Sequence, residues 1–147
     1  MDFSLQIAAE IERNVLAALA EDIGGGDLTA LLATAGRRAA AFIRRTLWID
    51  SEQRLLRRYR DGDAASDGYA EDYAYLTSGL LELFQADGDP AWLEWATALQ
   101  AAQDRLFWDE ADAGWFSTTG NDPSVLLRLK EDYDGAEPAA GSVSVLN

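Results

Sequence analysis

The chain has no cysteine, no histidine and only three prolines among its 147 residues. Without cysteine it has no disulfide, no thiolate zinc site and no cysteine nucleophile. Without histidine it lacks the side chain that most often serves as a general base or a metal ligand. The carboxylates of Asp and Glu are therefore the main candidates for a catalytic acid or base in this protein.

Positive charge and long apolar runs are also scarce. The 12 Lys and Arg residues face 26 Asp and Glu residues, which gives a formal net charge of −14. Nucleic acids and anionic membranes repel such a chain, and no apolar run approaches the roughly 18 residues of a membrane-spanning helix. Met1 is not followed by the basic and apolar stretches of a signal peptide. We therefore expect a cytoplasmic protein that binds neither nucleic acid nor membrane.

Apolar residues make up 48% of the chain and include five tryptophans. This composition and length predict a single packed domain over residues 1–147. Eight arginines and only two acids lie between residues 37 and 60. Such a basic block is typical of a solvated helix face paired with neighbouring acids, and it could alternatively bind phosphate.

Apolar residues recur at helical spacing in four parts of the chain. They predict helices over residues 7–23, 34–48, 68–86 and 90–107, with a short turn over residues 27–33. Asp89 is expected to cap the last of these helices, with Pro90 at its first position.

Turn residues around Leu55, Leu56 and Tyr59 predict a short β-hairpin. A further strand is expected over residues 115–118, paired with residues 125–129, and residues from Gly135 onward are expected to form a loop. The predicted fold class is all-α, built from antiparallel helical hairpins with one small β-hairpin.

Residues 11–33, IERNVLAALAEDIGGGDLTALLA, resemble the N-terminal segment of quinolinate (nicotinate-nucleotide) phosphoribosyltransferases. That family often reads ALxEDIGxGDLT at this place. The phosphate-binding barrel of the family has no counterpart in this chain, so the resemblance does not imply the transferase activity.

Residues 39–147 resemble a different family, the C-terminal part of thioredoxin-domain-containing, spermatogenesis-associated proteins. The matching strings are GYAEDYA at 68–74, DPAWL at 89–93, QDRLFWDE at 103–110 and KEDYDGAEP at 130–138. This region of the family is similar to the (α/α)6 toroids of sugar epimerases and six-hairpin glycosidases. The resemblance implies that the chain holds part of such a toroid, because it has too few helices for a complete ring.

The two resemblances together suggest a chimera, in which a borrowed helical leader (residues 1–36) precedes a toroid fragment (residues 37–147). A fragment of a closed ring would expose apolar surface that is unfavourable in water. We therefore expect self-association, most simply as a twofold homodimer.

Glu71 and Asp72 are the first candidates for catalytic residues. They open the predicted third helix, and in toroid enzymes this end of the inner helices faces the substrate, so the pair could act as general acid and base. Acids in a first helical turn also stabilise the helix dipole and cap free N–H groups, which is the alternative role for both residues.

The densest group of acids lies after Lys130. Clustered carboxylates suit a divalent cation, which could activate water in place of the missing histidine. The candidate metal ligands are Glu131, Asp134 and Glu137, with Asp132 as a further catalytic residue. The spacing selects no particular metal, and a solvated acidic loop is the alternative.

Three aromatic residues are candidates for substrate contacts: Tyr69, Tyr73 and Trp115. The toroid resemblance implies that such rings stack on sugars, whereas aromatics at helical spacing are more often part of a core. The sequence thus predicts a small hydrolase of an ester-type, phosphoester or glycosidic small-molecule substrate. The alternatives are a carbohydrate-binding fragment and a catalytically silent fragment that only self-assembles.

Overall fold

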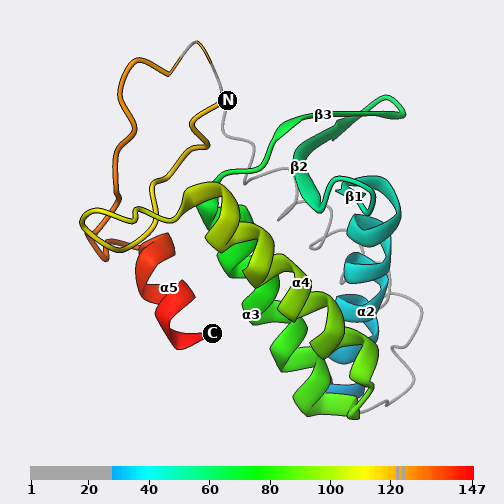
Figure 1. Ribbon diagram of the computed structural model, residues 1–147. Helices are drawn as coiled ribbons and strands as arrows, with labels where there is room; N and C mark the ends of the chain where they lie inside the picture. The colour runs from blue at the N-terminus through cyan, green and yellow to red at the C-terminus, as the bar shows by residue number, and fades with distance from the viewer. Residues whose placement is uncertain (1–27, 122, 124) are drawn as a thin grey trace.

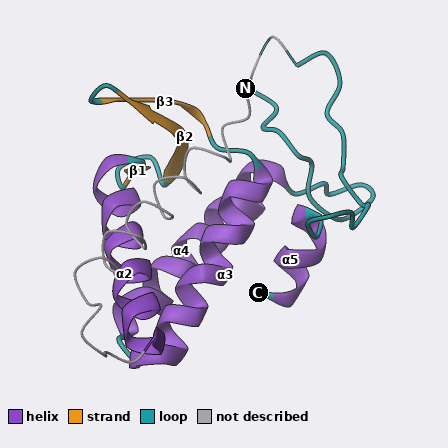
Figure 2. Ribbon diagram, turned by 180° about the vertical axis from the view of Figure 1, so that it is seen from behind, coloured by secondary structure: helices purple, strands orange, loops and turns teal. Residues whose placement is uncertain are grey.

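The computed structural model describes residues 28–121, 123 and 125–147. In chain order the elements are α2 (Leu28–Thr46), β1 (Trp48–Ile49), β2 (Arg54–Arg60), β3 (Asp63–Asp67), α3 (Ala70–Asp87), α4 (Pro90–Phe107) and α5 (Ala140–Leu146). The hairpin of α3 and α4 forms the centre, with α2 on one side and α5 on the other (Figures 1 and 2). The mainly helical fold with one small antiparallel sheet is confirmed, and the predicted helix over residues 7–23 lies outside the described residues.

Helix α2 is longer than the sequence predicted. The expected turn over residues 27–33 is wrong, because the helix already begins at Leu28 and continues to Thr46. Gly36 does not interrupt it, since a single glycine inside a helix is only weakly unfavourable. A Cβ atom at Gly36 would lie 3.2 Å from Leu83 Cδ2, so the glycine allows α2 to approach α3 closely.

The turn between α3 and α4 follows the predicted chemistry. Helix α3 ends at Gly88, which has the left-handed φ of 71° and donates its N–H to Phe84 O. Asp89 then caps α4 by accepting the N–H of Ala91 at 3.0 Å, and Pro90 is the first helical residue. Backbone groups at the end of α3 and at the start of α4 thus find hydrogen-bond partners within two residues. This short connection makes α3 and α4 an antiparallel pair.

The predicted hairpin forms from β2 and β3, with Leu56 opposite Asp67 and Arg60 opposite Asp63. Its turn residues Asp61 and Gly62 have φ values of 53° and 86°. Two successive positive φ values are typical of the type I′ turn, which matches the right-handed twist of paired strands. The short strand β1, which the sequence did not predict, adds to the other edge through Trp48 and Leu55.

The segment after α4 does not form the predicted second hairpin. Residues 115–118 make one isolated bridge, between Trp115 and Trp108, and Ser117 donates its N–H to Leu129 O at 2.7 Å. The backbone of this segment is hydrogen-bonded to Phe107, Leu129 and Ala70 in turn instead of to one partner strand, so no regular ladder forms. The expected loop from Gly135 onward is also wrong in part, since residues 140–146 form α5.

The core lies between α2, α3, α4 and the inner face of the sheet. Its larger members are Ile43, Leu47, Trp48, Leu55, Tyr73, Leu80, Leu83, Trp95, Leu99 and Phe107. One polar side chain, Gln103, is also fully buried. Its amide donates to Ala70 O at 3.1 Å and to Ser144 Oγ at 2.8 Å, so it joins α4 to α3 and α5.

Candidate functional site

A pocket of about 320 Å³ lies at the N-terminal end of α3. The β2–β3 hairpin, the segment that leads into α3 and the loop after α4 form its wall. The lining residues are Arg57, Ser66, Asp67, Gly68, Tyr69, Thr118, Thr119 and Pro123. Its volume is at the lower end of the range of about 300–1,000 Å³ that is typical of small-molecule sites.

Close backbone packing brings these walls together. Gly68 donates its N–H to Leu55 O, and Ala70 donates its N–H to Ser117 O at 3.0 Å. A Cβ atom at Gly68 would lie 3.0 Å from Leu55 O and 3.2 Å from the Tyr73 ring. Glycine is therefore required here for the hairpin to pack against the start of α3.

Arg57 is the central charged group of the site. Its guanidinium carbon lies 3.9 Å from the centre of the Tyr69 ring, which is a cation–π contact. Its Nη2 lies 3.3 Å from Glu71 Oε1, and its Nε lies 3.5 Å from Asp72 Oδ2. Only 12% of the Arg57 side chain is exposed, so one largely buried arginine links the pocket wall to two of the three predicted catalytic carboxylates, Glu71 and Asp72.

Asp72 serves as a capping residue. Its Oδ2 accepts the N–H of Tyr69 at 2.7 Å, just before the first turn of α3. Burial raises the pKa of Asp72, while the Tyr69 N–H and the charge of Arg57 act in the opposite direction. These contacts match the capping alternative, since the carboxylate is already engaged by backbone and arginine.

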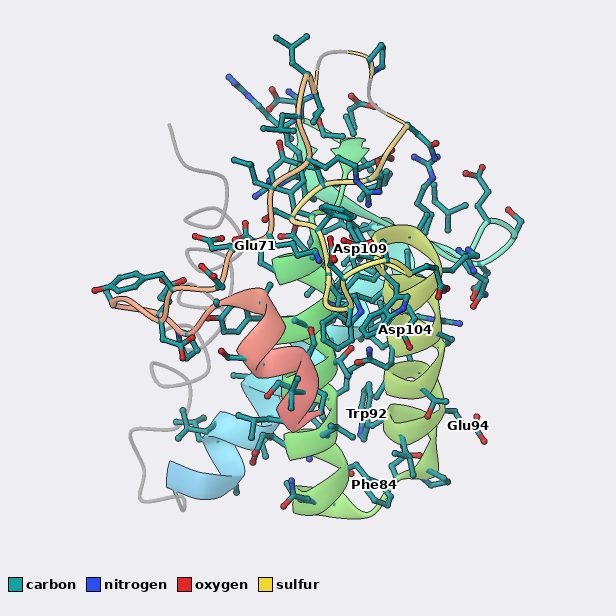
Figure 3. All side chains as sticks on the ribbon, turned by 60° about the vertical axis from the view of Figure 1, so that its left-hand side comes forward. Glu71, Phe84, Trp92, Glu94, Asp104 and Asp109 are labelled. Atoms are coloured by element: carbon teal, nitrogen blue, oxygen red, sulfur yellow. The ribbon has the colours of Figure 1, made fainter. Side chains whose placement is uncertain are left out.

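Glu71 is more accessible, with 40% of its side chain exposed. Burial is the main cause that raises its pKa, and the negative charges of Asp72, Glu131 and Glu137 add to the rise. The structure therefore brings Glu71 near two residues of the acidic loop. Figure 3 shows Glu71 at the same end of the α3–α4 pair as Asp109, while Phe84 lies at the opposite end.

The raised pKa of Glu71 predicts a specific pH dependence. A carboxyl with a higher pKa in the folded state binds more protons there, so its contribution to stability falls as pH rises from its ordinary pKa through the raised value. As the pH rises from about 4 to about 7, the stability of Glu71→Gln is therefore expected to increase relative to that of the wild type. Urea unfolding at both pH values measures this gain, with Glu94→Gln on α4 as the control, and a gain independent of pH would contradict the prediction.

The two predicted tyrosines occupy different environments. Tyr69 lines the pocket and is 42% exposed, as a substrate contact requires. Tyr73 is only 1% exposed, and its hydroxyl accepts the N–H of Leu55 at 2.7 Å. The prediction that Tyr73 contacts a substrate disagrees with this burial, because its helical spacing reflects a place in the core.

Trp115 does not line this pocket. Its indole donates to Asp104 Oδ1 at 2.9 Å, and its ring packs edge-on against Trp108 at 5.0 Å. Trp115 is partly buried against the core. The indole therefore fastens the loop after α4 to the end of that helix, and its predicted role as a substrate contact finds no support in this position.

The predicted metal ligands lie along an exposed loop. Glu131, Asp132 and Glu137 are exposed to solvent, and Asp134 Oδ1 accepts the N–H of Ala139 at 2.7 Å at the start of α5. This hydrogen bond lowers the pKa of Asp134. In the part of the chain that the structure describes, no three carboxylates converge on a common point suitable for a metal ion, so the metal site stays a prediction from the sequence.

The role of Arg57 was not predicted from the sequence. The arginine block over residues 37–60 was interpreted as a solvated helix face or a phosphate-binding patch, whereas Arg57 lies in β2, within the predicted hairpin. Alternation along the hairpin places Arg57 on the same side of the strand as the buried Leu55, which was the signal available. The partners of Arg57 are 14 and 15 residues away in the chain, and strand pairing alone does not identify them.

Comparisons with known proteins bear on most of the chain, although no family model matches it. Human spermatogenesis-associated protein 20 is 42% identical over 117 residues, which is 74% of this chain and 15% of the human protein. The rat protein of the same name is 41% identical over 125 residues, or 79% of this chain and 16% of its own length. An uncharacterised protein of Caenorhabditis elegans is 36% identical over 86 residues, or 58% of this chain and 12% of its own length.

These relatives support one of the two resemblances seen in the sequence. None of them is named as a phosphoribosyltransferase, so the resemblance of residues 11–33 gains no support and the chimera stays a prediction. Among the helices of the described residues, none has the length and apolar character to cross a membrane. The chain spans only about one-seventh of the length of the relatives it matches, 15% for the human protein. About three-quarters of this chain, 74%, is thus homologous to a segment of spermatogenesis-associated protein 20.

Proposed function

We propose that the pocket beside α3 binds a small, uncharged ligand rich in hydroxyl groups, such as a carbohydrate. The observation that carries this proposal is the composition of the wall, which combines the exposed Tyr69 ring with several hydroxyl groups. Aromatic rings pack against the apolar face of a sugar, and a few placed polar groups fix its orientation.

The charges of the pocket wall favour an uncharged ligand. Arg57 already faces Glu71 and Asp72. Asp67 is hydrogen-bonded to Arg54 from the neighbouring strand. A charged ligand would have to compete with these ion pairs, whereas a hydroxyl group can add hydrogen bonds to them.

The hydroxyl groups of the loop after α4 supply further hydrogen-bonding capacity. Thr118 lines the pocket, and its buried Oγ1 has no hydrogen-bond partner among the residues that the structure describes. Thr119 also lines the pocket although it is only 8% exposed. A buried hydroxyl without a partner is unfavourable, and a ligand hydroxyl that reaches it would satisfy it.

Binding can be tested by titrating the chain with glucose, galactose, N-acetylglucosamine and maltose while recording amide NMR shifts. We expect the largest shifts at Gly68 and Thr119, and a loss of affinity of at least about tenfold for Thr119→Val, which removes one hydrogen bond at nearly constant size. Tyr133→Ala, an exposed tyrosine outside the pocket, is the control. Amide shifts caused by glucose 6-phosphate or glucuronate, but not by the four uncharged sugars, would contradict an uncharged ligand. The absence of any shift at Gly68 and Thr119 with any sugar would refute the site.

We propose hydrolysis as a second function, with Glu71 as general acid. The observation that favours it is the raised pKa of Glu71 beside Arg57, since a catalytic acid must keep its proton near the working pH. Hydrolysis also needs a second carboxylate or an activated water, for which the sequence suggests Asp132 or a divalent cation.

Hydrolysis can be measured with p-nitrophenyl acetate, p-nitrophenyl phosphate and p-nitrophenyl glucosides, each with and without EDTA. Loss of turnover in Glu71→Gln, with sugar binding unchanged, would support this second function. Loss with EDTA and recovery with one added metal would support the cation. Turnover that is equal in Glu71→Gln and the wild type would remove Glu71 from the mechanism.

A further inference from the structure

Residues 125–133, here called the leucine segment, expose apolar side chains to solvent. Leu126 is 98% exposed, Leu127 73%, Leu129 63% and Tyr133 79%. A run of such residues in neighbouring positions is unusual for a soluble protein surface and typically marks an interaction site. Figure 1 shows this segment standing away from the helices.

Basic residues of the same segment point inward. Arg128 donates to Thr118 O at 3.0 Å and to Leu106 O at 3.2 Å, and its guanidinium lies 4.1 Å from the centre of the Phe116 ring. Lys130 bonds to Asp109 Oδ2 and to Ala113 O, both at 2.6 Å.

This pattern inverts the usual arrangement, in which charged residues face solvent and leucines are buried. Leu127 and Leu129 alternate along the chain with Arg128 and Lys130, which are fastened inward, and both leucines are exposed to solvent. The leucines are thus presented by an anchored segment, which lowers the entropy lost when a partner binds.

Exposed acidic residues follow the leucines in the chain. Glu131, Asp132, Asp134 and Glu137 follow within eight residues of Leu129, and the basic residue among them, Lys130, is paired with Asp109. The loop is held at its far end, because Tyr75 donates its hydroxyl to Pro138 O at 2.6 Å. Exposed apolar side chains followed in the chain by exposed carboxylates are complementary to a segment that offers apolar anchors beside Lys or Arg.

We propose that the leucine segment and the acidic residues that follow it dock a basic amphipathic peptide segment of another protein. Leu127 and Leu129 receive its apolar side chains, and the carboxylates attract its positive charges, as at other charge-complementary interfaces. A second copy of this chain fits less well, because each copy has a net charge of −14 and would bring a second acidic loop. This inference does not depend on the ligand of the pocket.

The test uses the full chain and a fluorescein-labelled synthetic helix of about 14 leucine and lysine residues, followed by fluorescence anisotropy. Saturable binding is expected. Leu127→Ser with Leu129→Ser should weaken binding at least about tenfold without changing the net charge. Leu93→Ser on α4, where the leucine is 40% exposed, is the matched control.

A second pair of variants separates docking from general attraction to an acidic protein. Glu131→Gln with Asp132→Asn should weaken binding about fivefold, whereas Glu82→Gln with Glu94→Gln should have a smaller effect. Equal loss in both pairs, or full binding by the serine double variant, would overturn the proposal. Sedimentation that shows a dimer dependent on Leu127 and Leu129 would also overturn it in favour of self-association.

Discussion

Replacing Arg57 by alanine is expected to lower the free energy of unfolding by about 3 kcal/mol. The reason is that Asp72, whose side chain is only 11% exposed, would lose the guanidinium that lies 3.5 Å from its Oδ2. A nearly buried carboxylate without a cation is far more destabilising than the loss of a surface ion pair. Glu71 loses the same partner, at 3.3 Å.

Urea unfolding followed by circular dichroism measures this effect. Arg60→Ala is the matched control on the same strand, because Arg60 is 71% exposed and pairs with Asp61, which is 88% exposed. It should change stability by less than about 0.5 kcal/mol. Adding Asp72→Asn to Arg57→Ala should restore most of the loss, since asparagine still accepts the Tyr69 N–H. Equal effects of Arg57→Ala and Arg60→Ala would show that the ion pair with Asp72 does not stabilise the site.

Replacing Phe107 by alanine is expected to remove about 3–5 kcal/mol of stability. Phe107 is 0% exposed at the end of α4, and its ring meets the Tyr73 ring edge-on at 5.4 Å. The cavity would open beneath the start of α3, because Tyr73 lies there and bonds to Leu55 of the hairpin. The structural change should therefore reach the pocket as well as the core.

Thermal and urea unfolding measure this loss, and Leu93→Ala on the exposed face of α4 is the control. That variant should change stability by less than about 1 kcal/mol, since the side chain is 40% exposed. Amide NMR shifts at Gly68 would report whether the pocket is disturbed. A loss below about 1 kcal/mol for Phe107→Ala would contradict the assignment of this residue to the core.

The helices of the α3–α4 hairpin could be predicted from the sequence because their signals are local. Apolar residues repeat every three or four positions, and Gly88, Asp89 and Pro90 end one helix and start the next within three residues. The Asp61–Gly62 turn was recognisable for the same reason. Where local signals are weak, as before Thr34 and after Trp108, the predicted boundaries and the second hairpin were wrong.

The site depended on contacts between distant parts of the chain. Glu71 and Asp72 were identified as candidates because they open a helix, and the structure places both beside Arg57. Arg57 itself was missed. Tyr69, Tyr73 and Trp115 were assigned to substrate as aromatic residues in a chain that resembles a toroid, and of these only Tyr69 contacts Arg57 and lines the pocket. Whether an aromatic ring is buried or open depends on what packs over it, and periodicity does not contain that information.

Composition and local pattern were thus sufficient for the exclusion of cysteine and histidine chemistry, the acidic character and the helical hairpin, because each of these follows from residue types or from neighbours in the chain. The burial of Arg57, the capping role of Asp72 and the outward leucines beside an inward Arg128 and Lys130 arise from packing between segments far apart in the chain. Such long-range contacts select which of several chemically capable residues remain accessible, and in this protein they leave Tyr69, Glu71 and the leucine segment facing solvent.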